Sequence, residues 1–232
     1  CQQALGVRAD MTAGHSYGEL VALSAAGVFD DAALIDLSRA RAEAMLTDAG
    51  TDMGAMAAIS LSVHELEPLL NDFPDVVMAN QNSPQQTVIS GPTATVTAAL
   101  TALRAQGVAA KAIDTACAFH SPLMAAASAR FAQALASCEM HPAACPVYAN
   151  VTAQVHEADA VRERLAQHIV APVRFVAEIE QMYADGARTF IEVGPRRVLT
   201  GLVGRILAER PHTAIALDQE GKGLAGLLGS LA

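Results

Sequence analysis

A single serine in a glycine-flanked turn is the residue of this chain best suited to covalent chemistry. Segment 14–18 reads Gly-His-Ser-Tyr-Gly, the pattern of a nucleophile elbow, in which a strand turns sharply into a helix. Small residues two positions before and after the serine let strand and helix pass closely. A short apolar-biased run at 9–13 and a helix-forming run at 19–26 flank the turn. We therefore predict a nucleophilic Ser16; the alternative is a glycine-rich turn whose serine only caps the helix.

Two other residue types have the chemistry to work with such a serine. His120 precedes Ser-Pro at 121–122, which suits a helix start, and histidine has the pKa of a general base. Loops display catalytic groups, although a single histidine among seven is most often structural. Arg39 and Arg41 lie two residues apart on a predicted helix at 32–46, so one can be solvated while the other points inward. A solvated helix face remains the alternative for either arginine.

Several predicted elements must position these residues. Among them, segment 53–114 has the pattern of a separate unit. Strands are predicted at 55–61, 76–79, 86–90 and 108–113, helices at 63–70 and 93–106, and a turn at 80–84. The order β-α-β-β-α-β is that of a ferredoxin-like fold. We therefore predict an inserted ferredoxin-like small subdomain at 53–114.

The remaining residues, 1–52 and 115–232, are predicted to form one large α/β catalytic subdomain. After the elbow and its two helices, strands are predicted at 146–150, 189–193 and 213–217, and helices at 122–137, 159–169, 175–184, 198–209 and 223–231. Alternating strands and helices favour a parallel sheet with helices on both faces. The predicted fold class is therefore α/β, with a sheet similar to that of α/β-hydrolases and an inserted small subdomain.

Composition and charge exclude several classes of function. The chain has 232 residues, of which 52% are apolar, and a net charge of −9, which argues against nucleic acid and anionic membranes as partners. No apolar run reaches the ~18 residues of a membrane span, and no signal peptide pattern is present. The four cysteines lack metal-binding spacing, which favours free thiols in a reducing cytoplasm and no bound metal. A first residue other than Met suggests a fragment of a longer polypeptide.

Four motifs together resemble those of the malonyl-CoA:acyl-carrier-protein acyltransferase family. They are Gly-His-Ser-Tyr-Gly-Glu at 14–19, Arg-Ala-Glu-Ala-Met at 41–45, Ala-Phe-His-Ser at 118–121 and Glu-Val-Gly-Pro at 192–195. The phrase Ala-Asn-Gln-Asn-Ser-Pro at 79–84 also fits the family. Tyr17, Pro-Val-Arg-Phe at 172–175 and Tyr-Ala-Asp-Gly-Ala-Arg at 183–188 are similar to acyltransferase domains of iterative type I synthases, of the enediyne polyketide or polyunsaturated fatty-acid type.

The resemblance implies a mechanism by two half-reactions. Ser16 would attack the thioester of malonyl-CoA, with His120 as general base, and the malonyl ester would then pass to the phosphopantetheine thiol of an acyl carrier protein. The family forms a dyad in which a backbone carbonyl orients the histidine, and here that carbonyl would belong to His168. No bound cofactor is implied, and neighbouring synthase domains, a ketosynthase among them, are the expected partners.

The resemblance also assigns residues to the substrate and to the oxyanion. Arg41 would bind the malonyl carboxylate bidentately, and Phe119 would crowd a methyl group at the α-carbon. The backbone N–H of Tyr17 would form one half of the oxyanion hole. The family takes its second donor from an upstream Gly-Gln-Gly loop that this sequence does not contain, so a fragment of this extent is expected to be poorly active. His15 and Asn82 would lie at the acyl-binding cleft, with packing in the elbow and turn chemistry as their alternatives.

Two other functions remain open from the residues alone. A serine esterase or thioesterase would use water as acceptor, but such enzymes order their triad Ser, Asp or Glu, His, and Asp114 offers no secure acid. Arg41 also has no obvious use in a simple esterase. The other alternative is a non-catalytic scaffold domain of a megasynthase. Glu19 is expected to favour the N-terminus of its helix electrostatically rather than to act as an acid.

Overall fold

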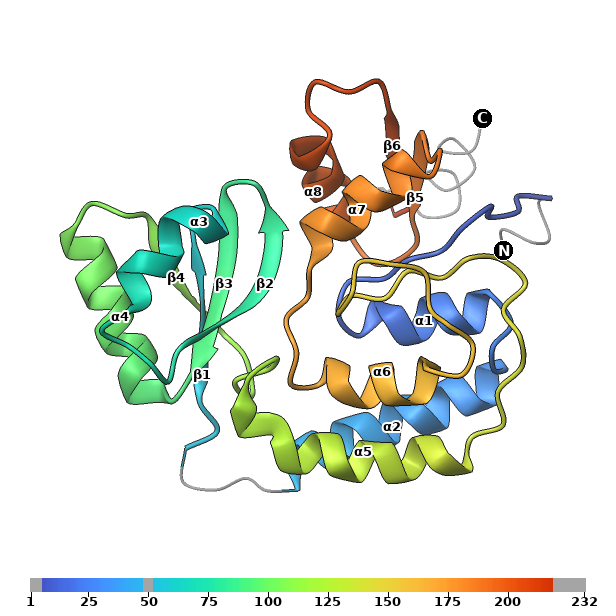
Figure 1. Cartoon of the computed structure of the whole chain (residues 1–232), viewed down its shortest axis with the longest axis horizontal. Helices are drawn as coiled ribbons and strands as arrows, with labels where there is room; N and C mark the ends of the chain where they lie inside the picture. The colour runs from blue at the N-terminus through green and yellow to red at the C-terminus, as the bar shows by residue number, and fades with distance from the viewer. Residues whose placement is uncertain (1–5, 48–51, 219–232) are drawn as a thin grey trace. The chain divides into compact units, whose positions relative to one another are not determined.

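The computed structural model describes residues 6–47 and 52–218 (Figure 1). The chain divides into two compact units, residues 1–178 and 179–232. This division differs from the predicted boundaries at 52/53 and 114/115, which stay a prediction. The helix expected at 223–231 lies outside the described residues.

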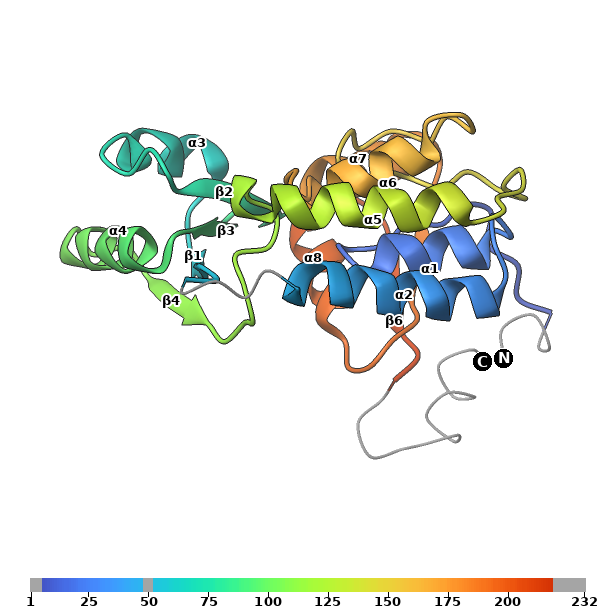
Figure 2. The same ribbon diagram turned by 90° about the horizontal axis from the view of Figure 1, so that it is seen from below.

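Four helices form the core on which the elbow is built. They are α1 (Gly18–Ala25), α2 (Asp31–Leu46), α5 (Ala125–Ser137) and α6 (Val161–His168). Asp30 caps α2 by accepting a hydrogen bond from the Ala33 N–H. Helix α5 packs against both α2 and α6 (Figures 1 and 2). Buried apolar side chains from all four helices meet in one cluster, so α1, which follows the elbow directly, is packed against the rest of the core.

The start of the predicted helix at 122–137 differs from the expectation. Its first turn is a 3₁₀ helix, η3 (Pro122–Met124), and α5 follows it. The Ser121 hydroxyl donates to the Ala118 carbonyl instead of capping the helix. This contact closes the turn that carries His120, which has a φ of 58°.

Residues 55–113 form a four-stranded antiparallel sheet with strand order β2-β3-β1-β4, the ferredoxin-like order. The elements are β1 (Ala55–Ile59), α3 (Val63–Leu66), η2 (Glu67–Leu70), β2 (Val77–Ser83), β3 (Gln86–Gly91), α4 (Thr93–Ala105) and β4 (Ala110–Ile113). Ala57, Ile59 and Ile89 pack with the two α-helices in one apolar cluster. Met56 and Val88, which alternate with those residues, pack with Phe119 instead, so the sheet has a second covered face.

The turn predicted at 80–84 is wrong, because most of it is strand. Strand β2 continues to Ser83, with irregularities in its register between Met78 and Asn80 and between Gln81 and Ser83. Its outer edge pairs with Val173, whose N–H donates to the Ala79 carbonyl and whose carbonyl accepts from the Gln81 N–H. Asn and Ser are typical turn residues, so local composition could not predict a strand that is completed by a partner so far along the chain.

Parallel pairing is present in both units. In the first unit, the expected strands at 9–13 and 146–150 are reduced to a single parallel bridge between Thr12 and Val147. In the second, β5 (Thr189–Glu192) and β6 (Thr213–Ala216) pair in parallel and α8 (Val198–Ile206) packs on both. Helix α7 (Phe175–Ala184) contains the boundary between the units. The mixed α/β class is confirmed.

In the described part of the chain, every helix is too short or too polar to cross a bilayer.

Candidate active site

The elbow holds Ser16 in a strained backbone conformation. Ser16 has a φ of 53°, a region that residues other than glycine adopt rarely. Position 14 has no room for a side chain, because a Cβ atom there would lie 1.9 Å from the backbone carbon of Gly18. The helix therefore starts in contact with the segment that precedes the turn. This geometry fits the elbow pattern, and it directs the Ser16 hydroxyl to an imidazole that lies 104 residues away in sequence.

The Ser16 Oγ lies 2.8 Å from the Nε2 of His120. The other ring nitrogen, Nδ1, lies 2.9 Å from the His168 carbonyl and 3.0 Å from the Ala171 carbonyl. Since carbonyls only accept, Nδ1 carries the proton and Nε2 is free to accept from the serine hydroxyl. Burial lowers the pKa of His120 from 6.5 to about 3, and the neighbouring His168 acts in the same direction. The imidazole is therefore neutral at pH 7 and has the state of a base.

Asn150 holds the backbone of the elbow, a role that the sequence did not indicate. Its Oδ1 accepts from the Ser16 N–H at 2.7 Å. Its Nδ2 donates to the Gly14 carbonyl and, at 3.0 and 3.1 Å, to the carboxyl oxygens of Glu178. Asn150 is fully buried. The amide thus contacts the backbone groups on both sides of His15, directly before the nucleophile, and fixes the strained turn.

Glu19 lies in the first turn of α1, as predicted, and its side chain is also fully buried, which the sequence did not indicate. Its carboxylate accepts from His156 Nε2 at 2.8 Å and from the Asn150 N–H at 3.1 Å, and its Oε2 lies 3.2 Å from His168 Nδ1. Burial alone would raise the pKa of Glu19, but His168, His156 and the Asn150 N–H together lower it below the ordinary range. Burial and the charge of Glu19 raise the pKa of Glu178 well above 4.5. The two buried carboxyl groups of the site therefore have pKa values that are shifted in opposite directions.

The two arginines of α2 have different environments. Arg39 has a side chain that is 64% exposed and forms an ion pair with Asp36 at 3.4 Å. The guanidinium of Arg41 lies 6.0 Å from the centre of the Tyr17 ring, and burial lowers its pKa. Its charge also contributes to the lowered pKa of His120. Tyr17 occupies the N-cap position of α1, where the backbone N–H has no partner within the helix.

His15, Asn82 and Phe119 lie around the same site. His15 Nε2 and Asn82 Oδ1 are 2.7 Å apart, and the His15 ring packs edge-on against Phe175 at 5.1 Å between centroids. Burial lowers the pKa of His15, so this imidazole is neutral and donates to the amide. Phe119, next to His120, packs against Met56 and Val88 of the small sheet. The structure thus brings all the predicted site residues to one region of the first unit.

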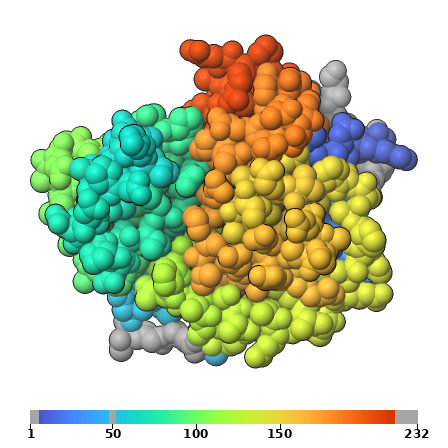
Figure 3. Space-filling view, viewed as in Figure 1, coloured from blue at the N-terminus to red at the C-terminus, as the bar shows by residue number. Residues whose placement is uncertain are grey.

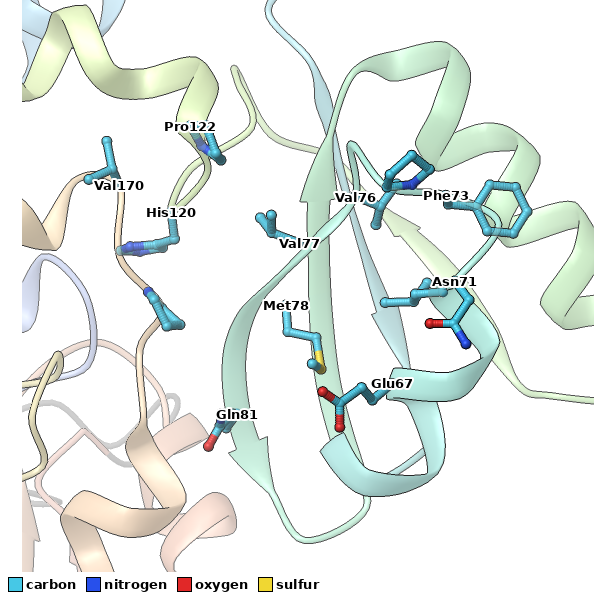
Figure 4. A pocket seen from close by; sticks show the side chains of 13 residues that line it. Glu67, Asn71, Phe73, Val76, Val77, Met78, Gln81, His120, Pro122 and Val170 are labelled. Carbon is cyan, nitrogen blue, oxygen red and sulfur yellow. The ribbon is translucent and has the colours of Figure 1, made fainter.

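A cavity of about 630 Å³ reaches His120 from the side of the small sheet. Figure 4 shows two sets of lining residues opposite each other: His120, Pro122 and Val170 on one side, and Val77, Met78 and Gln81 on the other. The lining is mostly apolar, and Glu67 is its one carboxylate. In the space-filling view, the cyan-to-green residues of the small sheet lie against the yellow and orange residues around 150–175 (Figure 3). The base is therefore accessible from the border between the small sheet and the helical core.

Comparisons with known proteins identify the family. The sequence family described as "Acyl transferase domain" matches residues 1–228. The chain is 40% identical over 201 residues to a malonyl CoA-acyl carrier protein transacylase of Synechocystis sp., a match that covers 86% of this chain and 67% of that protein. It is 36% identical over 210 residues to one component of the polyunsaturated fatty acid synthase of Thraustochytrium sp., covering 89% of this chain and 7% of that component.

A solved structure agrees with the sequence matches. The acyltransferase domain of an iterative polyketide synthase in enediyne biosynthesis superposes with a TM-score of 0.87 and 30% identity. That match covers 99% of this chain and 60% of the other. The chain thus spans part of the length of each of these relatives. Together, the sequence match over nearly the whole chain and the shared fold show that the chain belongs to the acyl transferase domain family.

Proposed function

We propose that this domain transfers a malonyl group from malonyl-CoA to the phosphopantetheine thiol of an acyl carrier protein, through an ester on Ser16. The observation that carries the proposal is the 2.8 Å contact between Ser16 Oγ and the unprotonated Nε2 of His120. A serine hydroxyl becomes a competent nucleophile when a neighbouring base takes its proton. The relatives that are named as malonyl CoA-acyl carrier protein transacylases support this choice of donor and acceptor.

The first half-reaction forms the ester. As the Ser16 Oγ attacks the thioester carbon, His120 Nε2 takes the hydroxyl proton, and the carbonyl oxygen becomes an oxyanion. The Tyr17 N–H at the start of α1 stabilises that oxyanion together with the positive end of the helix. Collapse of the tetrahedral intermediate breaks the carbon–sulfur bond, and the imidazolium returns the proton to the CoA thiolate. The carbonyls of His168 and Ala171 accept from Nδ1–H throughout, so the ring keeps its orientation.

The second half-reaction repeats these steps with a different nucleophile. His120 takes the proton of the phosphopantetheine thiol, whose sulfur attacks the malonyl-serine carbonyl. The departing Ser16 oxygen then recovers its proton from the imidazolium. The apolar cavity that reaches His120 suits a neutral pantetheine chain, because the cavity places little charge along its wall. The acceptor thus reaches the base from the side of the small sheet.

Arg41 supplies the charge that selects a dicarboxylic acyl group. A guanidinium can bind the free malonyl carboxylate with two parallel hydrogen bonds, which an acetyl group cannot accept. Arg41 is the arginine of α2 whose guanidinium lies over the ring of Tyr17, the residue that follows the nucleophile, whereas Arg39 is exposed and paired with Asp36. His15, Asn82 and Phe119 would then shape the remaining wall of the acyl site. The match to a large synthase component supports a chain that works beside other synthase domains. A ketosynthase is the neighbour that we propose.

The nature of the partners of His120 favours this dyad over a hydrolase triad. In a serine esterase, a carboxylate accepts from the histidine Nδ1–H. Within the described residues, the acceptors at His120 Nδ1 are two backbone carbonyls. The test is product partition: purified protein, malonyl-CoA and a phosphopantetheinylated carrier protein are mixed, and malonyl-carrier protein and free malonate are quantified. We expect carrier-protein loading to dominate. Malonate released at the same rate with and without carrier protein would identify a hydrolase.

A further inference from the structure

We infer that Glu19 is a positioning residue that holds both members of the Ser16–His120 pair through one buried carboxylate. The inference takes Ser16 as the nucleophile, as the proposed function does, but it does not depend on which acyl group Ser16 accepts. It concerns a residue that touches neither reacting atom. Glu19 contacts the two residues that hold the serine backbone and the imidazole.

The contacts form a closed ring through five residues. Ser16 Oγ lies 2.8 Å from His120 Nε2, and His120 Nδ1 lies 2.9 Å from the His168 carbonyl. The His168 side chain lies 3.2 Å from Glu19 Oε2, and the same oxygen accepts from the Asn150 N–H at 3.1 Å. Asn150 Oδ1 returns to the Ser16 N–H at 2.7 Å. The contact between His168 Nδ1 and Glu19 Oε2 is a close charged contact, the other links are hydrogen bonds, and all of them join buried or half-buried groups of the first unit.

The protonation states around Glu19 are consistent with a fixed direction of these hydrogen bonds. Glu19 has a lowered pKa and burial lowers the pKa of His168, so the pair is a carboxylate and a neutral imidazole at pH 7. His168 Nδ1 and His156 Nε2 then carry the protons that the carboxylate accepts. Among the described residues, His168 Nε2 and His156 Nδ1 are buried and have no partner. His168 Nε2 is the nitrogen that a neutral His168 leaves unprotonated, so no buried N–H of that ring is left unsatisfied.

Glu19 contacts the side chain of His168, whose carbonyl orients His120. His168 is the last residue of α6, so its carbonyl is one of the helix-end groups that lack a partner within the helix. The direction of such a carbonyl depends on what holds the end of the helix. Here the His168 side chain is tethered to Glu19, while its carbonyl is aimed at His120. Loss of the carboxylate would release both the end of α6 and the backbone of Asn150, and small displacements of this kind reduce reactivity strongly.

The test measures the reactivity of Ser16 with two reagents, malonyl-CoA and a small fluorophosphonate, which labels activated serines of any specificity. Glu19→Gln keeps the shape of the side chain but removes its charge. We expect labelling by the fluorophosphonate and acylation by malonyl-CoA to fall about tenfold to a hundredfold, with the KM for malonyl-CoA changed less than about twofold. The matched control is Glu65→Gln, the same change at an exposed carboxylate that accepts from Ser62 in a capping box. It should retain full reactivity.

A second pair of variants separates positioning from stability. His168→Asn places an amide nitrogen where Nδ1 stood and keeps a donor to Glu19, whereas His168→Ala keeps only the backbone carbonyl. We expect His168→Asn to retain at least half of the labelling rate and His168→Ala to lose about tenfold, both measured on protein shown to be folded by circular dichroism. Equal rates in these two variants, or wild-type reactivity in folded Glu19→Gln, would overturn the inference. If wild-type protein reacts with the fluorophosphonate but not with malonyl-CoA, the proposed function fails while the inference is still tested.

Discussion

The Oγ of Ser16 and the Nε2 of His120 lie 2.8 Å apart, and both residues have positive φ angles, 53° and 58°. Positive φ angles are unfavourable for both residues, so the surrounding fold must stabilise the backbone that brings their reactive atoms together. The strain at Ser16 is held by Asn150 and by the close approach of Gly14 to Gly18. At His120 it is held by the turn that Ser121 closes. Each support can be tested separately.

The base can be tested by its dependence on pH. Burial lowers the pKa of His120 to about 3, so the imidazole stays unprotonated well below the ordinary value of 6.5. We expect the rate of Ser16 labelling by a fluorophosphonate to change less than about twofold between about pH 7.5 and 5.5. A histidine with an ordinary pKa would lose about tenfold at the lower pH. An acid limb centred near 6.5 would contradict the environment described for His120.

The burial that keeps His120 unprotonated at low pH should also make the folded protein less stable there. Between pH 6.5 and about 3 the unfolded chain binds a proton at His120 that the folded chain excludes, so the free energy of unfolding should fall as the pH falls through this window. Burial lowers the pKa of His15 and His168 as well, which adds to the effect. Urea titrations monitored by circular dichroism at about pH 7.5, 6.5 and 5.5 check this. Stability that rises on acidification would contradict it, and the same measurements show which labelling rates refer to folded protein.

Gly14 should tolerate no side chain. In Gly14→Ala the new Cβ would lie 1.9 Å from the backbone carbon of Gly18, so we expect destabilisation by about 3 kcal/mol or more and loss of Ser16 labelling. The matched control is Gly201→Ala in α8, where a Cβ meets nothing within 4 Å. That change should stabilise the protein by about 0.5–1 kcal/mol, because alanine favours the helix. Thermal unfolding of both variants decides the point, and a Gly14→Ala protein of wild-type stability would refute the close approach.

Sequence reasoning predicted the parts of the site that depend on local patterns. The elbow at Ser16 is present where its short motif indicated it. The orientation of His120 by the carbonyl of His168 came from the family resemblance, and the contact is present at 2.9 Å. A backbone carbonyl does not depend on the side chain of the residue that supplies it, so this contact could be predicted from the resemblance alone.

The polar interior of the site could not be predicted in the same way. Glu19 and Asn150 are 131 residues apart, and Asn150 and Ser16 are 134 residues apart. Contacts at such separations leave no periodicity or spacing in the sequence. A glutamate in the first turn of a helix is explained equally well by the helix dipole, and that explanation concealed its burial. Strand β2 was misread for a related reason, since its outer edge is completed by Val173 from a distant segment.

The two arginines of α2 provide a matched test of acyl selection. Arg41→Ala should lower kcat/KM for malonyl-CoA by about 10- to 100-fold and raise the relative rate with acetyl-CoA, since a charged hydrogen bond contributes about 1.5–3 kcal/mol. Arg39→Ala removes an arginine whose side chain is 64% exposed and should leave both rates unchanged. Competition between the two CoA thioesters gives the ratio directly. Unchanged selectivity in Arg41→Ala would remove this residue from the acyl site.

The central claim is that Ser16 accepts the malonyl group covalently, and intact-mass spectrometry tests it most directly. The protein is mixed with malonyl-CoA, quenched in acid at short times and weighed, with Ser16→Ala and His120→Ala treated alike. We expect one malonyl adduct in the wild type, mapped to Ser16 by peptide sequencing. The adduct should be absent in Ser16→Ala and form about 10³-fold more slowly in His120→Ala. An adduct of equal yield in Ser16→Ala would contradict the account.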